Sequence, residues 1–453
     1  MVSALIMMNH KGWTFEELFN RMDFDILTRT AFGLSDINDD TVCPATIFNF
    51  QNKISKYFSE NKVNLIEKTF DNLTKEQIKA LGIKTNIQRS DSTLIASNIR
   101  NYSRLQLLVE VLLRLFRILN DADKKQFSDE LKRYLKYESS EQYIYHLRGI
   151  DLPHELEAIG QIYSKLYACF KETYKETETF QTFKRVFFEH FKLDEDKINV
   201  IPSKELGSGI VQSPDDLDAT YRKKGDDKSH GTIINVVETC HPDNELNLIT
   251  DLVVKPNNVD DSEILNERID KILEKTPDLA ELHTDGGYGS EGNDKRFDEL
   301  NITHIQTAIR GRESKVKLDI AEISDEKYLI SCPFQSVEST KSKTRFKANF
   351  IYQICKDCPH VNDCPTKQHK KYRVYYFKHE DYLKNRRHKS IELLPKERRK
   401  LRANVEATMK EFKNKIPDGK LKVRGLYKTI IFAFTKAMSI NFGRIYRNNA
   451  KKC

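Results

Sequence analysis

Apolar residues at helical spacing dominate the first part of the chain. They recur every three or four positions in TFEELFNRMDFDILTRTAFGL and, after a turn-rich break, in NDDTVCPATIFNFQNKISKYF. This spacing predicts short helices joined by turns, and we assign residues 1–80 to an N-terminal helical region. We predict that this region is a DNA-binding module. A plain helical bundle would have the same pattern, because helical propensity does not distinguish the two.

The pattern changes at residues 84–98, KTNIQRSDSTLIASN. Its β-branched residues and its alternation of polar and apolar positions predict a strand, which we place in a first core segment, residues 81–102. Strong helical spacing then returns in NYSRLQLLVEVLLRLFRIL and the segments that follow it. Residues 103–200 are therefore predicted to form an all-helical insertion into another domain.

Segments with strand character return after the helical block. GTIINVVETC and LNLITDLVVKP predict two strands, residues 260–275 predict a helix, and AELHTDGGYGS and THIQTAIRG predict two more strands. We therefore predict an α/β fold whose later core strands lie in residues 201–311. A cysteine-containing insert, residues 312–380, separates these strands from the C-terminal part of the core, residues 381–453.

The last predicted core helix, residues 396–413, carries one acid among many cations. Its apolar positions fall on one face at helical spacing: Leu401, Val405, Met409 and Phe412. Arg402 precedes Glu406 by one helical turn, and Lys413 follows it by two turns. A carboxylate between such cations suits a site that holds a metal ion and a polyanion together. The simpler interpretation is a solvated partner for the neighbouring arginines.

Charge is unevenly distributed along the chain. The balance of 75 Lys+Arg against 67 Asp+Glu gives a net charge of only +8, but residues 367–402 and 413–447 are densely basic. Clustered cations are typical of a surface that binds a polyanion. No apolar run approaches the roughly 18 residues that suggest a membrane span. Because the start of the chain is a poor export signal, we expect a cytoplasmic protein with reduced cysteines and no membrane partner.

Two further acids stand out by their positions. Asp91 lies within a predicted strand, where aspartate is disfavoured, and Asp285 lies at the end of another strand, before Gly286 and Gly287. An edge strand or a simple turn would also explain them. Together with Glu406 they would form an oxygen-rich site for Mg²⁺ or Mn²⁺, of the kind that supports phosphoryl displacement with two metal ions.

These residues resemble the motifs of insertion-sequence transposases of the DDE class, which have an RNase H-like catalytic core. The family's third-acid signature is Tyr, two residues, Arg, three residues, Glu, six residues, Lys. This chain has Arg402, Glu406 and Lys413 at the matching positions and Arg399 in place of Tyr. DSTLIAS at Asp91 resembles the first-acid strand, and HTDGGYGS at Asp285 resembles the second-acid turn.

The resemblance implies a fold and an activity. The fold would be an RNase H-like mixed sheet flanked by helices, interrupted by a helical insertion and preceded by an N-terminal helical domain. The activity would be that of a bacterial DNA transposase, in which Asp91, Asp285 and Glu406 bind Mg²⁺ or Mn²⁺ and catalyse cleavage and strand transfer. Arg399, Arg402 and Lys413 would bind DNA. The partners would be the terminal inverted repeats of its element, target DNA and a second copy of the chain.

Other functions and another first acid remain open at this stage. A related metal-dependent nuclease would cut DNA without joining it, and an inactive, truncated or repurposed copy would only bind DNA. Asp215, Asp216 and Asp218 form a second acidic cluster. If one of them were the first acid, no helical insertion would interrupt the core. We favour Asp91, because its surroundings predict a strand and those of the cluster predict a loop.

The insert before Glu406 contains a group of cysteines that suits a structural zinc ion. Cys355 and Cys358 form a C-x-x-C pair, with Cys332 and Cys364 on either side. Four thiolates are a common tetrahedral zinc site, and His360 is an alternative ligand. Four reduced thiols without a metal are the competing interpretation.

Overall fold

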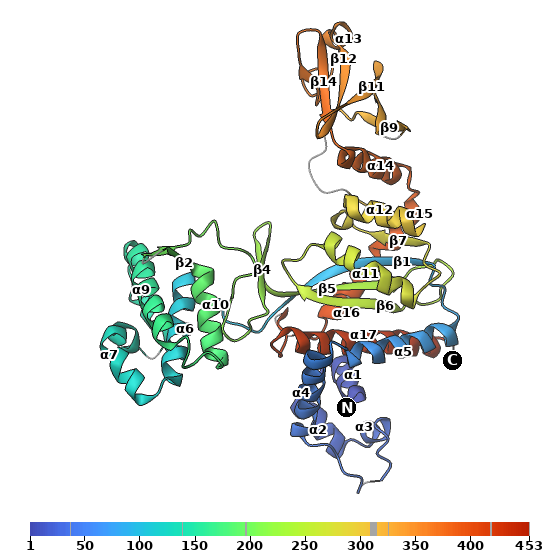
Figure 1. The fold of residues 1–453 in the computed structure, drawn as a ribbon. Coiled ribbons are helices and arrows are strands. Elements are labelled where there is room, and N and C mark those ends of the chain that lie inside the picture. Colours follow the sequence, from blue (N-terminus) through green and yellow to red (C-terminus); the bar gives the residue numbers. More distant parts are fainter. Residues whose placement is uncertain are drawn as a thin grey trace.

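The computed structural model describes residues 1–36, 38–137, 139–194, 197–308, 315–324, 326–416 and 419–452. Figure 1 shows a central sheet with helices on both faces, a helical lobe to one side, a second sheet at one end and a group of N-terminal helices at the other. Helices and strands thus mix in one chain, as the predicted α/β class requires.

The central sheet contains parallel and antiparallel strands. Its members are β1 (Ile87–Ala96), β4 (Thr220–Lys224), β5 (Asp227–Thr239), β6 (Ile249–Pro256), β7 (Glu281–Thr284) and β8 (Thr303–Gln306). β1 lies in the middle, antiparallel to β5 and parallel to β7, and β8 extends the sheet beyond β7. β4 and β6 both pair with β5 along its other edge. The strand that was predicted around Asp91 is therefore confirmed as the centre of the sheet.

Two layers of helices cover this sheet because its strands bury apolar residues on both faces. The neighbouring residues Val236 and Val237 of β5 belong to different hydrophobic clusters. The cluster that contains Val237 includes residues of α11 (Asp261–Lys275) and α12 (Glu291–Leu300). The cluster that contains Val236 includes residues of α16 (Val405–Lys413) and α17 (Leu426–Ala450). Alternation along a strand therefore determines which helices lie on each face.

The N-terminal helices belong to the same core as α17. They are α1 (Val2–Lys11), α2 (Phe15–Phe24), α3 (Ile26–Ala31), α4 (Pro44–Asn61) and α5 (Leu65–Leu81). Buried residues such as Leu5, Ile47 and Phe70 lie in one cluster with Phe434 of α17, and Figure 1 shows α5 alongside α17 beneath the sheet. Residues 1–80 thus contain helices, as the spacing predicts, and their packing joins them to α17 near the end of the chain.

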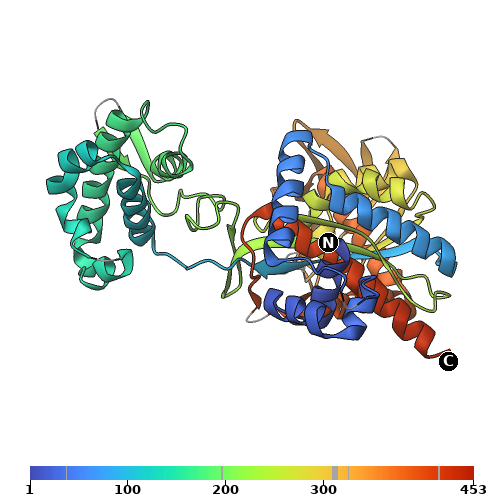
Figure 2. The ribbon, with the colours of Figure 1, turned by 90° about the horizontal axis from the view of Figure 1, so that it is seen from below.

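A helical lobe separates β1 from β5 in the sequence. It comprises α6 (Arg104–Ile118), α7 (Asp121–Leu135), α8 (Ser140–Tyr145), a 3-10 turn (Gly149–Asp151), α9 (Leu152–Phe170), α10 (Glu178–His190) and a hairpin of β2 (Phe191–Asp194) and β3 (Lys197–Val200). The hairpin corrects the prediction that residues 103–200 are all-helical. Its buried residues form a hydrophobic cluster of their own, rich in leucine, phenylalanine and tyrosine. Figure 2 shows the lobe beside the main body, joined to it by extended chain.

The cysteine-containing segment forms a second sheet, which the sequence pattern did not predict. Its antiparallel strands are β9 (Asp319–Ser324), β10 (Lys327–Cys332), β11 (Gln335–Ser342), β12 (Arg345–Ile351), β13 (Lys367–Gln368) and β14 (Tyr372–Phe377), with α13 (Tyr352–Lys356) between β12 and β13. Tyr328, Phe346, Phe350 and Phe377 are buried in its own small core. The chain then returns to the central sheet through α14 (His379–Leu393) and α15 (Lys396–Ala403).

The helix predicted over residues 396–413 is wrong in one respect. It is two helices, α15 and α16, that meet at Asn404. Val405, Met409 and Phe412 are buried against the sheet as expected, but Leu401 is only partly buried. Asn404 keeps near-helical backbone angles, φ −68° and ψ −15°, but the side chains of Arg402 and Glu406 have different surroundings. Spacing along the sequence therefore does not by itself place Arg402 beside Glu406.

Candidate active site

Asp91 and Asp285 are neighbours across two parallel strands. β1 and β7 pair in the register Ile87 to Glu281, Gln88 to Leu282 and Arg89 to His283. Asp91 and Asp285 each lie two residues beyond the last of these pairs, so the same register places them next to each other. Carboxyl ends of parallel strands meet at one edge of a sheet, where ligands commonly bind. The fold thus brings together two acids that are far apart in the sequence.

The Asp91 carboxylate has two hydrogen-bond donors and two acidic neighbours. Its Oδ1 accepts from the backbone N–H of Ser92 at 2.8 Å, and its Oδ2 accepts from Nη2 of Arg402 at 3.0 Å. Burial raises the pKa of Asp91, and the charges of Asp285 and Asp261 raise it further. The Ser92 N–H and the Arg402 guanidinium lower it, but the net pKa stays above the ordinary value.

Asp285 begins the glycine-rich turn that follows β7. Its Oδ1 accepts a hydrogen bond from the backbone N–H of Gly287 at 2.7 Å, which caps a short 3-10 turn, Gly286–Tyr288. The turn is also packed tightly, since a Cβ on Gly289 would lie 2.7 Å from Nε2 of Gln306. This close approach is at Gly289, which we had not singled out, and it holds the turn against the end of β8.

Asp261 is a third carboxylate near this pair, and sequence reasoning missed it. It is the first residue of α11 and is buried. Its charge raises the pKa of both Asp91 and Tyr288, so it lies close enough to act on each of them. The sequence VDDSEI predicts an ordinary helix start, because acidic residues are common in the first turn of a helix. The sequence pattern therefore offered no reason to assign Asp261 to a site.

A buried hydrogen-bond network supports the acid pair from the opposite face of β1. The Nδ2 group of Asn235 donates to the hydroxyl of Tyr288 at 2.6 Å and to Oγ of Ser90 at 3.1 Å. The hydroxyls of Ser92 and Tyr288 lie 2.9 Å apart. Burial raises the pKa of Tyr288 well above its ordinary value, so the phenol stays protonated. This network fixes β1, β5 and the turn after Asp285 relative to one another.

Glu406, the predicted third acid, has a different environment. It lies in the first turn of α16 and is exposed. Within the described part of the chain it forms no hydrogen bond or ion pair. Arg402, which we expected to share its groove, pairs instead with Asp91 at the end of α15. α15 and α16 thus pass over the face of β1 that carries Asp91, and Arg402 of α15 contacts that carboxylate.

The other predicted DNA-binding residues lie on the same helices. Nη2 of Arg399 donates to the backbone carbonyl of Ile391 at 2.5 Å, and Arg399 remains exposed. Lys413 ends α16 and is exposed. Arg398, which we had not singled out, pairs with Glu281 of β7. Of these cations, Arg402 alone is recorded in contact with a predicted acid among the residues that the structure describes.

The alternative acidic cluster has structural partners. Oδ1 of Asp215 pairs with Nη2 of Arg114 at 2.9 Å. Asp216 is buried and accepts from Ser97 at 2.5 Å, and Asp218 accepts from the backbone N–H of Leu426 at the start of α17. These contacts join the segment before β4 to β1, α6 and α17. The three aspartates of this cluster therefore join elements of the fold. Asp91 lies near two other acids, Asp285 and Asp261, and so is the better candidate for the first acid.

The four cysteines of the second sheet gather around one cavity. Cys332, Cys355, Cys358 and Cys364 all line it, together with His360. Burial raises the pKa of Cys355, and the other three thiols act in the same direction. Among the described residues, however, no three His, Cys, Asp or Glu side chains are already arranged to hold a metal ion. The predicted thiols are thus close together without having the geometry of a closed metal site.

Comparison with known families agrees with the C-terminal part of this picture. Residues 330–446 match a family described as "Transposase DDE domain". The match includes most of the second sheet, α14, α15, and α16 with Glu406, but it begins after Asp91 and Asp285. Neither curated proteins nor solved structures gave a match. In the described chain, no helix is long and apolar enough to cross a membrane.

Proposed function

We propose that this protein is a DNA transposase that cuts and joins the ends of an insertion sequence, because residues 330–446 match the transposase DDE domain family. The observation that carries the proposal is the position of Asp91 beside Asp285 across β1 and β7. The strand order β6, β5, β1, β7, β8 agrees with an RNase H-like core, and the helical lobe lies between β1 and β5 in the sequence.

Among the described residues, no three acidic side chains are already arranged around a metal position, but Asp91 and Asp285 offer the oxygen ligands that a divalent cation prefers. Mg²⁺ and Mn²⁺ prefer oxygen ligands and need only one or two carboxylates when substrate phosphate supplies the rest. Asp91 and Asp285 would hold the ion. Burial is the main cause that raises the pKa of Asp91, with smaller contributions from Asp285 and Asp261, and a bound cation would favour the ionised carboxylate. When bound, the ions supply Lewis-acid stabilisation of charge on the transferring phosphate. Glu406 and Asp261 are the candidates for a third carboxylate.

The protein's own groups prepare this site. The Ser92 N–H favours the ionised form of Asp91, which is the form that binds metal, and Arg402 balances the charge of that carboxylate while no metal is bound. The Asn235–Tyr288 network keeps β1 and the Asp285 turn in register. The exposed cations of α14 and α15 would bind DNA phosphates and bring the scissile bond to the acids. A second copy of the chain on the same DNA remains a prediction, as does a cytoplasmic location.

DNA cleavage with Mg²⁺ and a duplex that contains the element's own ends tests this proposal. We expect Asp91→Ala, Asp285→Ala and Glu406→Ala each to abolish cleavage while DNA binding is largely retained. Asp270→Ala is the matched control, because Asp270 is an exposed aspartate of α11 that pairs with Arg296. Cleavage that survives Asp91→Ala but is lost on substitution of Asp215, Asp216 or Asp218 would move the first acid to the other cluster.

Two alternatives predict different products. A nuclease of the same fold would cut the ends but would not join them to a target duplex, so a strand-transfer assay separates it from a transposase. A protein that only binds DNA would show metal-independent binding without nicking. The adjacent aspartates favour an enzyme over a binding protein, because two acids side by side with a single arginine are the ligands that a divalent cation prefers.

We also propose a structural zinc ion in the second sheet. The four cysteines that line one cavity are the ligands that zinc prefers, and thiols must lose their protons when they bind it. The ion would join β10 to the loop around α13, a region whose core is small. Binding would require the thiols to move into a tetrahedral arrangement.

A further inference from the structure

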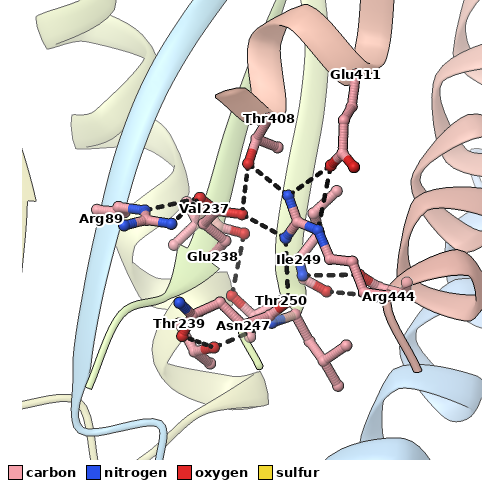
Figure 3. Close-up of polar contacts among 12 residues, drawn as sticks. Arg89, Val237, Glu238, Thr239, Asn247, Ile249, Thr250, Thr408, Glu411 and Arg444 are labelled. Carbon is pink, nitrogen blue, oxygen red and sulfur yellow. Dashed lines mark hydrogen bonds and ion pairs between the residues drawn. The ribbon is translucent and has the colours of Figure 1, made fainter. Parts of the chain in front are cut away.

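A fully buried ion pair lies beneath the two helices that carry Arg402 and Glu406. Glu238, near the end of β5, is 0% exposed, and its Oε1 accepts from Nε of Arg89 on β1 at 2.7 Å. Figure 3 shows these two side chains meeting between the strands, with Thr408 and Arg444 approaching from the helices. Buried charges are costly, so such a pair needs further hydrogen bonds to be tolerated.

Those further hydrogen bonds go to α15 and α16. Nη1 of Arg89 donates to the backbone carbonyl of Leu401 at 2.6 Å. Oε2 of Glu238 accepts from Oγ1 of Thr408 at 2.8 Å. Residues 401 and 408 lie on either side of the break at Asn404, and Arg402 and Glu406 both lie between them. The ion pair thus holds the segment at two points that enclose Arg402, which contacts Asp91, and Glu406.

α17 completes the network from the other side. Nη1 of Arg444 donates to Oε2 of Glu238 at 2.7 Å, and its Nη2 donates to Oγ1 of Thr408 at 2.6 Å and to Oε2 of Glu411 at 2.8 Å. Burial alone would raise the pKa of Glu238, but Arg444 and Arg89 outweigh it and hold the pKa below its ordinary value. The carboxylate therefore stays charged at neutral pH.

The need for such an anchor follows from the break at Asn404. α15 has only eight residues, and α16 has nine. Helices this short are marginal by themselves and take their position from tertiary contacts. Without an anchor near the break, the two helices could change their mutual angle and carry Arg402 away from Asp91. Phosphoryl transfer depends on positioning to within fractions of an ångström, so this freedom would reduce the rate.

We propose that Glu238, acting through Arg89 and Thr408, is a positioning residue that holds the segment of Arg402 and Glu406 in place and so keeps Arg402 beside Asp91. This inference rests on the proposed function for its effect on cleavage, whereas its effect on the helices can be measured without it. Glu238 is not expected to touch DNA or metal, because it is buried and its carboxylate oxygens already accept hydrogen bonds from Arg89, Arg444 and Thr408.

Thr408→Val tests the proposal with little change in shape. Valine keeps the volume of threonine but has no hydroxyl. Glu238 and Arg444 would still bond to each other, and Arg444 would still bond to Glu411, so neither charge is left unpaired. Thr408→Ser restores the hydroxyl. Thr429→Val is the matched control, because Thr429 is a buried threonine of α17 whose hydroxyl donates to the backbone carbonyl of Gly425, one turn earlier in the chain.

Two measurements decide the outcome. In Thr408→Val we expect faster amide hydrogen exchange over residues 401–409 and a cleavage rate about 10–100-fold lower at saturating DNA, with unchanged affinity for the duplex. Thr408→Ser and Thr429→Val should behave like the parent in both. Unchanged exchange over residues 401–409 in Thr408→Val would overturn the proposal, as would an equal loss of rate in Thr429→Val. If the parent protein does not cut DNA, the proposed function fails. The positioning role of Glu238 is then judged only by amide hydrogen exchange over residues 401–409.

Discussion

At the scale of single residues, Asp91 combines opposing influences on one carboxyl group. Burial and the charges of Asp285 and Asp261 disfavour its ionised form, whereas Ser92 and Arg402 favour it. The net result is a raised pKa, which is typical of functional sites and is a cost to the folded state. Asp91 is therefore a position where function and stability are expected to oppose each other.

We expect Asp91→Asn to stabilise the metal-free protein at neutral pH while it abolishes cleavage. Asparagine resembles the protonated acid, so it removes the cost of the buried charge. A carboxyl whose folded pKa is raised favours folding below its ordinary pKa of 3.8 and loses that contribution as the pH rises through the folded value. The gain of the variant in thermal unfolding should therefore grow from acid to neutral pH. Asp270→Asn is the control, and a variant less stable than the parent at pH 7 would contradict the assignment.

Arg402 is expected to have two roles, binding a DNA phosphate and pairing with Asp91, and two measurements on Arg402→Ala separate them. In the structure it pairs with Asp91, and with DNA present its guanidinium can form two parallel hydrogen bonds with a phosphate. We expect Arg402→Ala to weaken binding to an end-containing duplex and to reduce the salt dependence of that binding by about one unit of slope. Lys413→Ala should do the same more weakly.

The second role of Arg402, its pairing with Asp91, is tested by measuring the affinity of the protein for Mn²⁺ in the absence of DNA. Loss of this cation removes a positive charge from beside the metal ligand Asp91, so the affinity for Mn²⁺ should rise in Arg402→Ala. Lys400→Ala is the matched control on the same helix, since Lys400 is exposed. If Arg402→Ala binds DNA and Mn²⁺ like the parent at every salt concentration, α15 is only a charged surface.

At the scale of elements, the segment from β9 to α16 shows how a site can depend on a separate module. The second sheet has a small core of its own, and in the sequence it lies between β8 and the helices that carry Arg402 and Glu406. α14 is joined to the central domain by ion pairs, among them that of Arg386 with Asp298 of α12 at 2.9 Å. The folding of this module therefore determines where α15 begins.

Purified protein should contain about one zinc ion per chain if the four cysteines bind it. We expect chelation, or Cys358→Ser, to lower the thermal stability of the second sheet more than that of the central domain, because its core is small. Cys169→Ser is the matched control, since Cys169 is an exposed cysteine of α9 far along the chain from this cavity. Metal analysis that finds no zinc in protein prepared without chelator would remove this proposal.

At the scale of the whole molecule, the central sheet is where the separate parts meet. Figures 1 and 2 show the helical lobe reaching out from the side where β1 and β4 end, while the second sheet stands at another side. Such an arrangement suits a substrate as long as a DNA duplex, because several surfaces can bind along it. The lobe in particular buries its apolar residues within itself.

We expect a fragment of residues 101–212 to fold alone, because it contains nearly all of the lobe's own cluster. Circular dichroism should show a helical spectrum and a cooperative thermal transition. A fragment of residues 1–81 is the matched comparison. Its buried residues share a core with α17, so it should unfold without cooperativity. A lobe fragment without a cooperative transition would show that the lobe needs the sheet.

Much of the architecture is determined by the sequence alone. The change from helical to strand spacing at residues 84–98 located β1, and the later strand and helix patterns located β5, β6, α11, β7 and β8. Asp91 and Asp285 stood out because aspartate within or at the end of a strand is unusual. These features are local, and local preferences of the chain are enough to predict them.

Only the tertiary structure decided which residues meet. The register of β1 against β7 placed Asp91 beside Asp285, and the fold added Asp261, whose position resembles an ordinary helix start. The pairing of Arg402 with Asp91, the break at Asn404, the buried Glu238 between Arg89 and Arg444, and the second sheet were likewise not predicted. Each depends on contacts between residues that are distant in the chain, and the pattern along one segment contains no information about its partner.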